Sequence, residues 1–216
     1  MEGSMKKVLS IFLVLLMAMM ALTACGGSGD SDSGDAGDVV PVTSVEELKT
    51  IGDIMALEAS DYSSAVYENQ VVYAFKLGDT YYRAKADISP EDAQAYWDVD
   101  YTAEDYEEQE AAIISPLEIR EIENLSEQIL SEEDCAALVG KTGQELQDAG
   151  WTYSGHDLES MEFWMEYGPF VYTVVFDGEV AEADYETFED EAGTKDMAVK
   201  SVTFSDSLGS HATDIE

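Results

Sequence analysis

Basic, imidazole and thiol side chains are scarce in this chain of 216 residues, which has 10 Lys and Arg, 2 His and 2 Cys against 47 Asp and Glu. The formal net charge of −37 argues against nucleic acid as a partner, because contact with phosphates needs clustered Lys and Arg. Two cysteines exclude a scaffold built from several disulfides. Hydrophobic residues nevertheless make up 45% of the chain, which is enough for a folded core and excludes a disordered acidic polymer.

A short apolar run lies near the N-terminus. Lys6 and Lys7 precede residues 8–22, which are almost entirely apolar. The run is too short for a transmembrane helix, which needs about 20 apolar residues, and its layout is typical of a secretory signal. It ends in Leu-Thr-Ala-Cys-Gly at residues 22–26, which resembles the lipobox of bacterial lipoprotein precursors.

This resemblance implies that residues 1–24 are a signal peptide and that Cys25 becomes the lipidated first residue of the mature protein. Acyl chains on Cys25 would anchor the protein in the lipid bilayer, on the extracytoplasmic face of the cell membrane. Two or more chains make a stable anchor where one does not. Residues 25–41, rich in Gly, Ser and Asp, then form a flexible tether. The alternative is an ordinary secretory signal with a fortuitous cysteine.

Residues 42–128 alternate helix and strand signals. Gly78-Asp79 is a two-residue turn between alternating segments, with Val71, Tyr73 and Phe75 on the inner side. The acidic stretch up to Glu110 is expected to be exposed, apart from packing contacts by Tyr96, Trp97, Tyr101 and Tyr106. The expected elements are a helix at 44–57, a hairpin of strands 71–77 and 80–88, a short helix from Pro90, and a strand at 116–125.

Residues 129–208 repeat this order. Ser131-x-x-Asp134 and Thr142-x-x-Glu145 are capping boxes for two short helices. Strands at 161–167 and 170–176 flank a Gly168-Pro169 turn, and a last strand is expected at 197–204. Residues 209–216 read as a polar tail. The sequence therefore predicts an α+β fold of antiparallel sheets, each with helices on one face, in two tandem related units.

The helix-turn-helix segment at 138–150, which leads into a meander, resembles in layout the repeated unit of β-lactamase-inhibitor-protein-like domains and small envelope lipoproteins, over about 70 residues. The segment departs from their pattern at Gly140-Lys141-Thr142, and the paired cysteines of the inhibitor family are missing. The resemblance implies binding of other proteins through the sheet or its loops, and does not imply inhibition of an enzyme.

Residues for nucleophilic catalysis are few. A nucleophile with a base would need His156, expected in a turn between strands, or His211, expected in the polar tail with little to fix its geometry. A Cys135–His156 pair is conceivable, but the acids that precede Cys135 oppose thiolate formation. Cys135 is better interpreted as a small core residue. No cofactor motif is found.

Acidic side chains offer weak calcium candidates. Asp98 and Asp100, and Asp177 and Glu179, are hard oxygen ligands, but neither stretch matches an EF-hand loop. A solvated acidic face is the preferred interpretation, with loose divalent binding as the alternative.

Two groups of residues are candidates for binding. Lys76, Arg83 and Lys85 gather on the outer face of the first hairpin together with Tyr81; they form either a docking patch or ion pairs with neighbouring acids. Trp164, flanked by acids on the outer side of the second hairpin, suits a protein or glycan contact, and equally suits a sheet face covered by a helix.

These observations predict a membrane-anchored extracytoplasmic lipoprotein that binds a protein or envelope component and performs no catalysis. A solute- or divalent-cation-binding surface lipoprotein and a cell-wall hydrolase are the alternatives. The sequence does not identify the partner.

Overall fold

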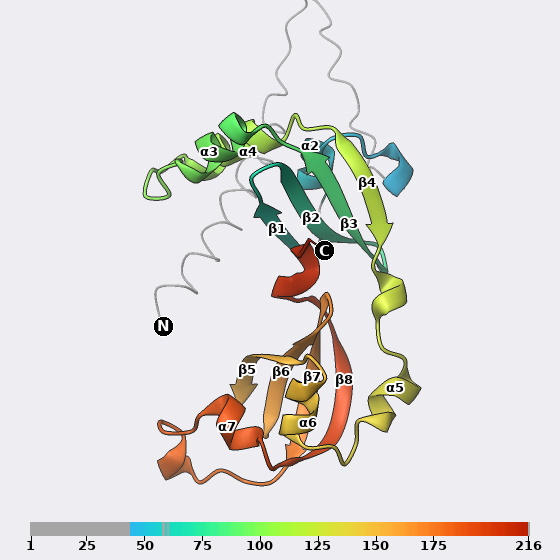
Figure 1. Cartoon of the computed structure of the whole chain (residues 1–216), viewed down its shortest axis with the longest axis vertical. Helices are drawn as coiled ribbons and strands as arrows, with labels where there is room; N and C mark the ends of the chain where they lie inside the picture. The colour runs from blue at the N-terminus through green and yellow to red at the C-terminus, as the bar shows by residue number, and fades with distance from the viewer. Residues whose placement is uncertain (1–43, 58, 60, 216) are drawn as a thin grey trace, which may run out of the picture. The chain divides into compact units, whose positions relative to one another are not determined.

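The computed structural model describes residues 44–215 except 58 and 60 (Figure 1). The signal segment, Cys25 and the tether lie outside the described residues. Two four-stranded antiparallel sheets follow one another along the chain, each with its strands in sequential order. The α+β class and its two tandem units are therefore confirmed.

The first sheet consists of β1 (Tyr62–Val66), β2 (Gln70–Leu77), β3 (Thr80–Asp87) and β4 (Ile119–Asn124). The expected hairpin of β2 and β3 is confirmed, with Tyr73 opposite Ala84 and Phe75 opposite Tyr82. Gly78 has a φ of +63° in the turn, a conformation that glycine adopts without steric cost. Strand β1, at the edge of the sheet, was not expected.

Short helices cover the inner face of this sheet: η1 (Val45–Glu47), α2 (Ile51–Met55), α3 (Pro90–Trp97) and α4 (Tyr106–Ile114). The prediction of one helix at 44–57 is wrong. Thr50 interrupts it by forming its own capping box with Asp53, whose carboxylate accepts hydrogen bonds from the Lys49 and Thr50 backbone N–H groups. Gly52 allows close approach, since a Cβ there would lie 2.9 Å from the Ser115 carbonyl oxygen.

The acidic stretch after α3 differs from the prediction in two ways. It contains helix α4, which the sequence analysis did not predict, and its N-cap residue Asp105 makes no side-chain capping hydrogen bond. In addition, Trp97 and Tyr101 are exposed rather than packed, whereas Tyr96 does contact the first core. The Ser89 cap and the start of α3 at Pro90 are confirmed.

The second sheet consists of β5 (Thr152–Asp157), β6 (Glu162–Tyr167), β7 (Phe170–Asp177) and β8 (Ala198–Leu208). The expected hairpin of β6 and β7 is confirmed. The Tyr153–Asp157 segment, expected as a turn, instead belongs to edge strand β5.

Both predicted capping boxes of the second unit are present, at the starts of α5 (Glu132–Ala137) and α6 (Gly143–Asp148). Cys135 of α5 and Leu146 of α6 are buried in the same core as Phe163, Tyr172 and the other inward residues of β6 and β7. Further short helices of the described chain are η2 (Ser126–Gln128), η3 (Glu182–Asp184) and α7 (Asp190–Thr194).

The C-terminal residues form 3-10 helix η4 (Ser210–Thr213), in which Ala212 and Thr213 are buried, so the expected polar tail is largely packed. Helix η4 contacts β1 and β2 of the first sheet as well as β7 of the second. The hydroxyl of Tyr67 donates a hydrogen bond to the Thr213 carbonyl oxygen at 3.1 Å.

Two buried clusters hold the fold together. One belongs to the inner face of the first sheet and its helices. The other centres on the second sheet but also includes Ala74 and Tyr81, which lie on the outer face of the first hairpin. Burial of apolar side chains in these clusters supplies the main stabilisation, at about 25 cal/mol per Å². None of the helices in the described part of the chain combines the length and apolar composition that a membrane span requires.

Candidate functional site

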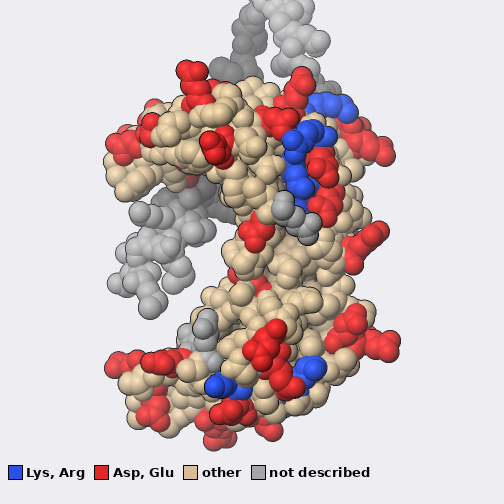
Figure 2. All heavy atoms as spheres, viewed as in Figure 1, with Lys and Arg blue, Asp and Glu red and all other residues tan. Residues whose placement is uncertain are grey.

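Each cation of the expected basic patch has an acidic partner. Lys76 Nζ lies 2.5 Å from Asp206 Oδ2, Arg83 pairs with Glu123 at 3.2 Å, and Lys85 Nζ lies 3.7 Å from Glu121. Arg83 also donates to the Asp214 carbonyl oxygen at 2.8 Å. Figure 2 shows Lys and Arg gathered beside Asp and Glu on this part of the molecule. The geometry therefore corresponds to the ion-pair interpretation of these residues.

Tyr81 lies opposite Lys76, as the two-residue turn predicts, but its expected exposure is wrong. Only 1% of its surface is accessible, and its ring packs edge-on against Phe170 and Phe204 of the second sheet. Its hydroxyl donates to Asp206 Oδ1 at 3.0 Å. Burial, followed by this hydrogen bond and the nearby charges of Asp206 and Asp61, raises the pKa of Tyr81 well above its ordinary value.

Asp206 links the two sheets from a bulged segment of β8. Its φ is +52°, a left-handed conformation that is uncommon outside glycine but tolerated by Asp and Asn. Hydrogen bonds from Lys76 and Tyr81 lower the pKa of its carboxyl group. Two residues later, the Leu208 backbone N–H donates to Asp61 Oδ2 at 2.6 Å. These contacts make Lys76 and Tyr81 parts of a structural junction.

Trp164, unlike Tyr81, lies away from the junction of the sheets. Its side chain is on the other face of the second sheet from those of Phe163 and Met165. The register sets Trp164 between Gly155 on β5 and Thr173 on β7, and Thr203 of β8 follows Thr173. The indole lies over Gly155: a Cβ built at Gly155 would come within 2.8 Å of Trp164 Cε3. With 41% of its surface accessible, Trp164 presents an aromatic group to solvent.

The surface around Trp164, named here the open face, contains small polar and β-branched side chains. All of them are exposed or half-buried. Its members are Glu162, Trp164, Thr173, Val175, Ser201 and Thr203. Thr173 and Ser205 share a hydrogen bond of 3.0 Å across the sheet. The side chains that pack with Cys135 and Leu146 belong to the other face.

Glu166 shares a strand face with Trp164 but is buried, contrary to the alternation expected for this hairpin. Its carboxylate accepts hydrogen bonds from the Ser210 backbone N–H at 2.7 Å and from the Ser210 hydroxyl at 2.8 Å. Gly209 allows this approach, since a Cβ there would lie 2.7 Å from Glu166 Oε2. The chain terminus therefore covers one end of the face and leaves Trp164 accessible.

The candidate nucleophile and bases are packed or hydrogen-bonded to neighbouring residues. Cys135 is buried, and burial followed by the charge of Asp134 raises the pKa of its thiol, which disfavours the reactive thiolate. His156 stacks on Phe163 and hydrogen-bonds to the Tyr153 hydroxyl. His211 is held by Asp214 at 2.8 Å and Thr152 at 3.3 Å, so the expectation that its geometry is unconstrained is wrong.

The four calcium candidates lie on the surface. Asp100 accepts hydrogen bonds from the Thr102 hydroxyl and backbone N–H, which lower the pKa of its carboxyl group, and Asp98 accepts one from Gln94. Asp177 ends β7, and Glu179 follows it. Among the described residues, no group of three or more His, Cys, Asp and Glu side chains is arranged to hold a metal ion.

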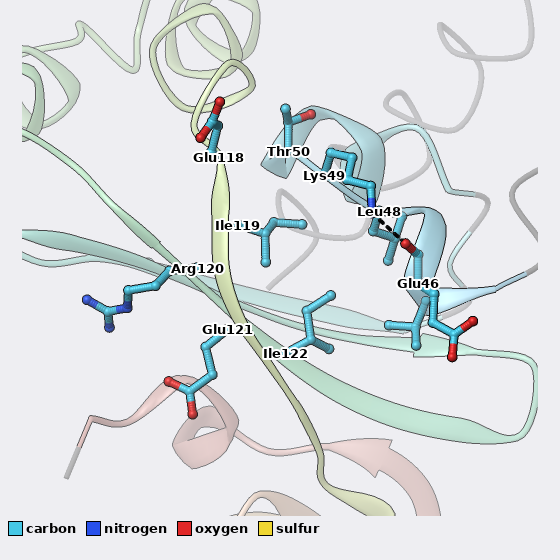
Figure 3. Close-up of a pocket in the computed structure, with 10 residues that line it drawn as sticks. Glu46, Leu48, Lys49, Thr50, Glu118, Ile119, Arg120, Glu121 and Ile122 are labelled. Atoms are coloured by element: carbon cyan, nitrogen blue, oxygen red, sulfur yellow. Dashed lines mark hydrogen bonds between the residues drawn. The ribbon is translucent and has the colours of Figure 1, made fainter.

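A shallow groove of about 560 Å³, which the sequence analysis did not predict, separates the η1–α2 segment from β4 (Figure 3). Ile119 and Ile122 of β4 point towards Leu48, while Arg120 and Glu121 point away from it. Lys49 Nζ donates to the Glu46 carbonyl oxygen at 2.7 Å, so this cation is already engaged. The lining of the groove combines two Ile with exposed charged side chains. It includes no Cys or His that could act as a nucleophile or base.

Comparison of the chain with family models, curated proteins and solved structures finds no match. Interpretation of the site therefore depends on its geometry alone. Of the predicted binding residues, Trp164 is the one large aromatic side chain that the structure leaves accessible, whereas Tyr81 is buried and the three cations are paired.

Proposed function

We propose that this protein is a lipid-anchored extracytoplasmic lipoprotein that binds a protein partner of the cell envelope through the open face around Trp164 and performs no catalysis. Cys25 is its attachment point to the bilayer, and residues 25–41 are the tether. The accessible indole of Trp164 on the open face is the observation that carries the proposed binding role.

The anchor is supported by the sequence at residues 22–26 and by the charged and apolar segments before it. Acyl chains contribute about 0.8 kcal/mol per buried CH₂, so two or more chains on Cys25 hold the protein stably at the membrane. The acidic folded part then remains in the aqueous phase beside it.

The binding role is supported by the chemistry of the open face. Trp is enriched among residues that dominate binding energy, because its ring supplies a large contact area with little conformational entropy to lose. Gly155 beneath the indole holds one side of the ring against the sheet and leaves the other available. Thr173 and Thr203 supply hydroxyl groups beside it.

The anchor is tested by mass spectrometry of the protein isolated from its host, together with incorporation of labelled fatty acid. Wild type and the Cys135→Ser variant are expected to carry acyl chains on residue 25 and to fractionate with membranes. Cys25→Ser is expected to lose both the label and the membrane fraction. A wild-type protein with unmodified Cys25 would refute the anchor.

The binding role is tested by placing a photo-crosslinking amino acid at Thr203, on the open face, or at Val139, an exposed position after α5. Cross-linking in cells is expected from position 203 and not from 139. Trp164→Ala is expected to lower the yield at 203 by about tenfold, the loss for a contact of about 1.4 kcal/mol. Equal yields at 203 with and without Trp164 would refute the role of this face.

A further inference from the structure

A second group of exposed aromatic side chains lies in the first unit, far along the chain from Trp164. Tyr62 at the start of edge strand β1 is 62% accessible, Trp97 at the end of α3 is 49% accessible, and Tyr101 in the following loop is 79% accessible. Large aromatic side chains that gather on a protein surface mark interaction sites more often than scattered ones do.

Two of these side chains are held against β1 and its neighbour. The Tyr62 ring stacks on that of Tyr73, with centroids 5.9 Å apart and planes inclined by 14°. The Trp97 indole N–H donates to the Val66 carbonyl oxygen, at the other end of β1, over 3.3 Å. Tyr62 and Trp97 therefore present their rings from the same edge of the sheet in defined orientations.

Tyr96 and Tyr106 belong to the same surface. Burial raises the pKa of Tyr73 to about 12, with further contributions from the phenol groups of Tyr62 and Tyr96. The pKa of Tyr106 is also raised, first by its hydrogen bond to Glu107 at 2.8 Å and to a small extent by Tyr62. The aromatic surface is thus formed by Tyr62, Tyr96, Trp97 and Tyr106, and the Tyr62 ring lies on the buried ring of Tyr73.

Carboxylates surround these rings without any basic side chain from the same segment. Residues 90–110 contain nine Asp and Glu and no Lys or Arg. Burial, followed by the charge of Glu110 and a hydrogen bond to it, raises the pKa of Tyr96. In Figure 2, the face of α3 and α4 in view carries Asp and Glu.

We propose that the aromatic surface binds a Lys- and Arg-rich segment of a protein. A cation over the face of Tyr or Trp is attracted by the ring quadrupole, and an Arg guanidinium also stacks on the ring. Glu107 and Glu110 supply carboxylates for charge-assisted hydrogen bonds to the same cations. The rings and carboxylates therefore bind the same Lys and Arg side chains of the partner.

Charge complementarity favours a Lys- and Arg-rich segment over other partners of this surface. An acidic peptide or an anionic lipid surface is repelled by the carboxylates of α3 and α4. A neutral apolar segment would bury Glu107 and Glu110 without a cation to compensate for their lost hydration. This surface lies on the first sheet and does not depend on the open face of the second.

The test uses the full-length protein in detergent with fluorescently labelled octa-arginine, measured by anisotropy at physiological salt. A chain of net charge −37 attracts any polycation weakly, so the comparison is between variants of equal charge. Trp97→Ala is expected to lower the affinity about fivefold or more, and Val139→Ala, which removes an exposed apolar side chain after α5, is expected to leave it unchanged. Equal affinities for the two variants would overturn the proposal.

A charge-matched pair of variants supplies a second measurement. Glu107→Gln with Glu110→Gln is expected to lower the affinity further than Glu132→Gln with Glu133→Gln, which removes the same charge from exposed positions on α5. Equal losses would show that octa-arginine responds to net charge alone and would refute the site. Circular dichroism and thermal melting confirm that each variant is folded.

Discussion

The two sheets have the same strand order, but the face of each sheet that its own helices do not cover is buried in the first sheet and accessible in the second. In β2 every residue from Val71 to Phe75 is buried, whereas β7 alternates buried and half-buried residues from Phe170 to Phe176. The first sheet packs helices on one face and meets η4 and the second core on the other. The second sheet keeps its open face accessible. A repeated topology therefore does not imply a repeated surface.

The two sheets depend on each other for burial, but the open face of the second sheet does not take part in these contacts. Asp206, Ala212 and Thr213, all from the end of the chain, contact or cover the first sheet. The first sheet contributes Ala74 and Tyr81 to the second core, but the open face needs no partner from the first sheet. Binding surfaces are consequently expected where a sheet face is left uncovered.

The largest expected difference is in the free energy of unfolding, when one aromatic side chain is removed from the face of each sheet that its own helices do not cover. Tyr81→Ala is expected to lower the free energy of unfolding by about 3–5 kcal/mol, because a large buried ring leaves a cavity. Trp164→Ala is expected to cost about 1 kcal/mol, since its ring contacts solvent on one side. Urea denaturation of both variants measures the two values. Similar losses would show that the two faces are equally buried.

An intermediate effect is expected at the junction of the sheets. Because hydrogen bonds from Lys76 and Tyr81 lower the pKa of Asp206, its ionised form stabilises the fold fully above the ordinary pKa of about 3.9 and loses this effect as pH falls through the lower folded pKa. Asp206→Asn, which tolerates the same backbone conformation, is expected to cost about 1 kcal/mol at pH 7.

The pH dependence distinguishes this charge effect from lost packing. The stability difference between wild type and Asp206→Asn is expected to shrink as pH falls below about 4, in denaturation curves measured at several pH values. A difference that stays constant with pH would mean that the carboxylate charge contributes nothing to the junction.

The smallest effect is expected at Gly155. An alanine Cβ there would lie 2.8 Å from Trp164 Cε3, so the indole must move away from the sheet. We expect Gly155→Ala to change the free energy of unfolding by less than about 1 kcal/mol and to shift Trp164 fluorescence to longer wavelength. Trp164→Ala in the same background should abolish the shift. Unchanged emission would show that the ring does not rest on Gly155.

Local signals predicted the hairpins and most helix starts. Gly78 and Gly168 mark the turns, and Ser131 and Thr142 begin helices as their capping boxes indicate. Helix α4 was missed although Asp105 and Glu108 have the spacing of a capping box, because the helix buries only Ile114 and its apolar periodicity is therefore weak. The edge strands β1 and β5 were missed because small, polar or glycine residues weaken their apolar alternation.

The candidate site was predicted only in part. Strand periodicity correctly predicted that Trp164 and Phe163 lie on different faces of the sheet. It also correctly predicted that Tyr81 lies opposite Lys76 in the hairpin. It did not reveal that Tyr81 is covered, because its partner Asp206 is 125 residues further along the chain. Local pattern indicates which face a side chain occupies, whereas long-range packing decides whether that face reaches solvent.

The position of η4 has a consequence for the order in which the chain folds. Val72 and Ala74 are synthesised about 140 residues before Ala212, whose segment helps to cover their sheet. A newly emerged first sheet therefore exposes an apolar surface until the last residues of the chain arrive. The apolar surface of the first sheet is thus buried only after the C-terminal residues have been synthesised. Premature chain termination would therefore leave this surface exposed and favour aggregation.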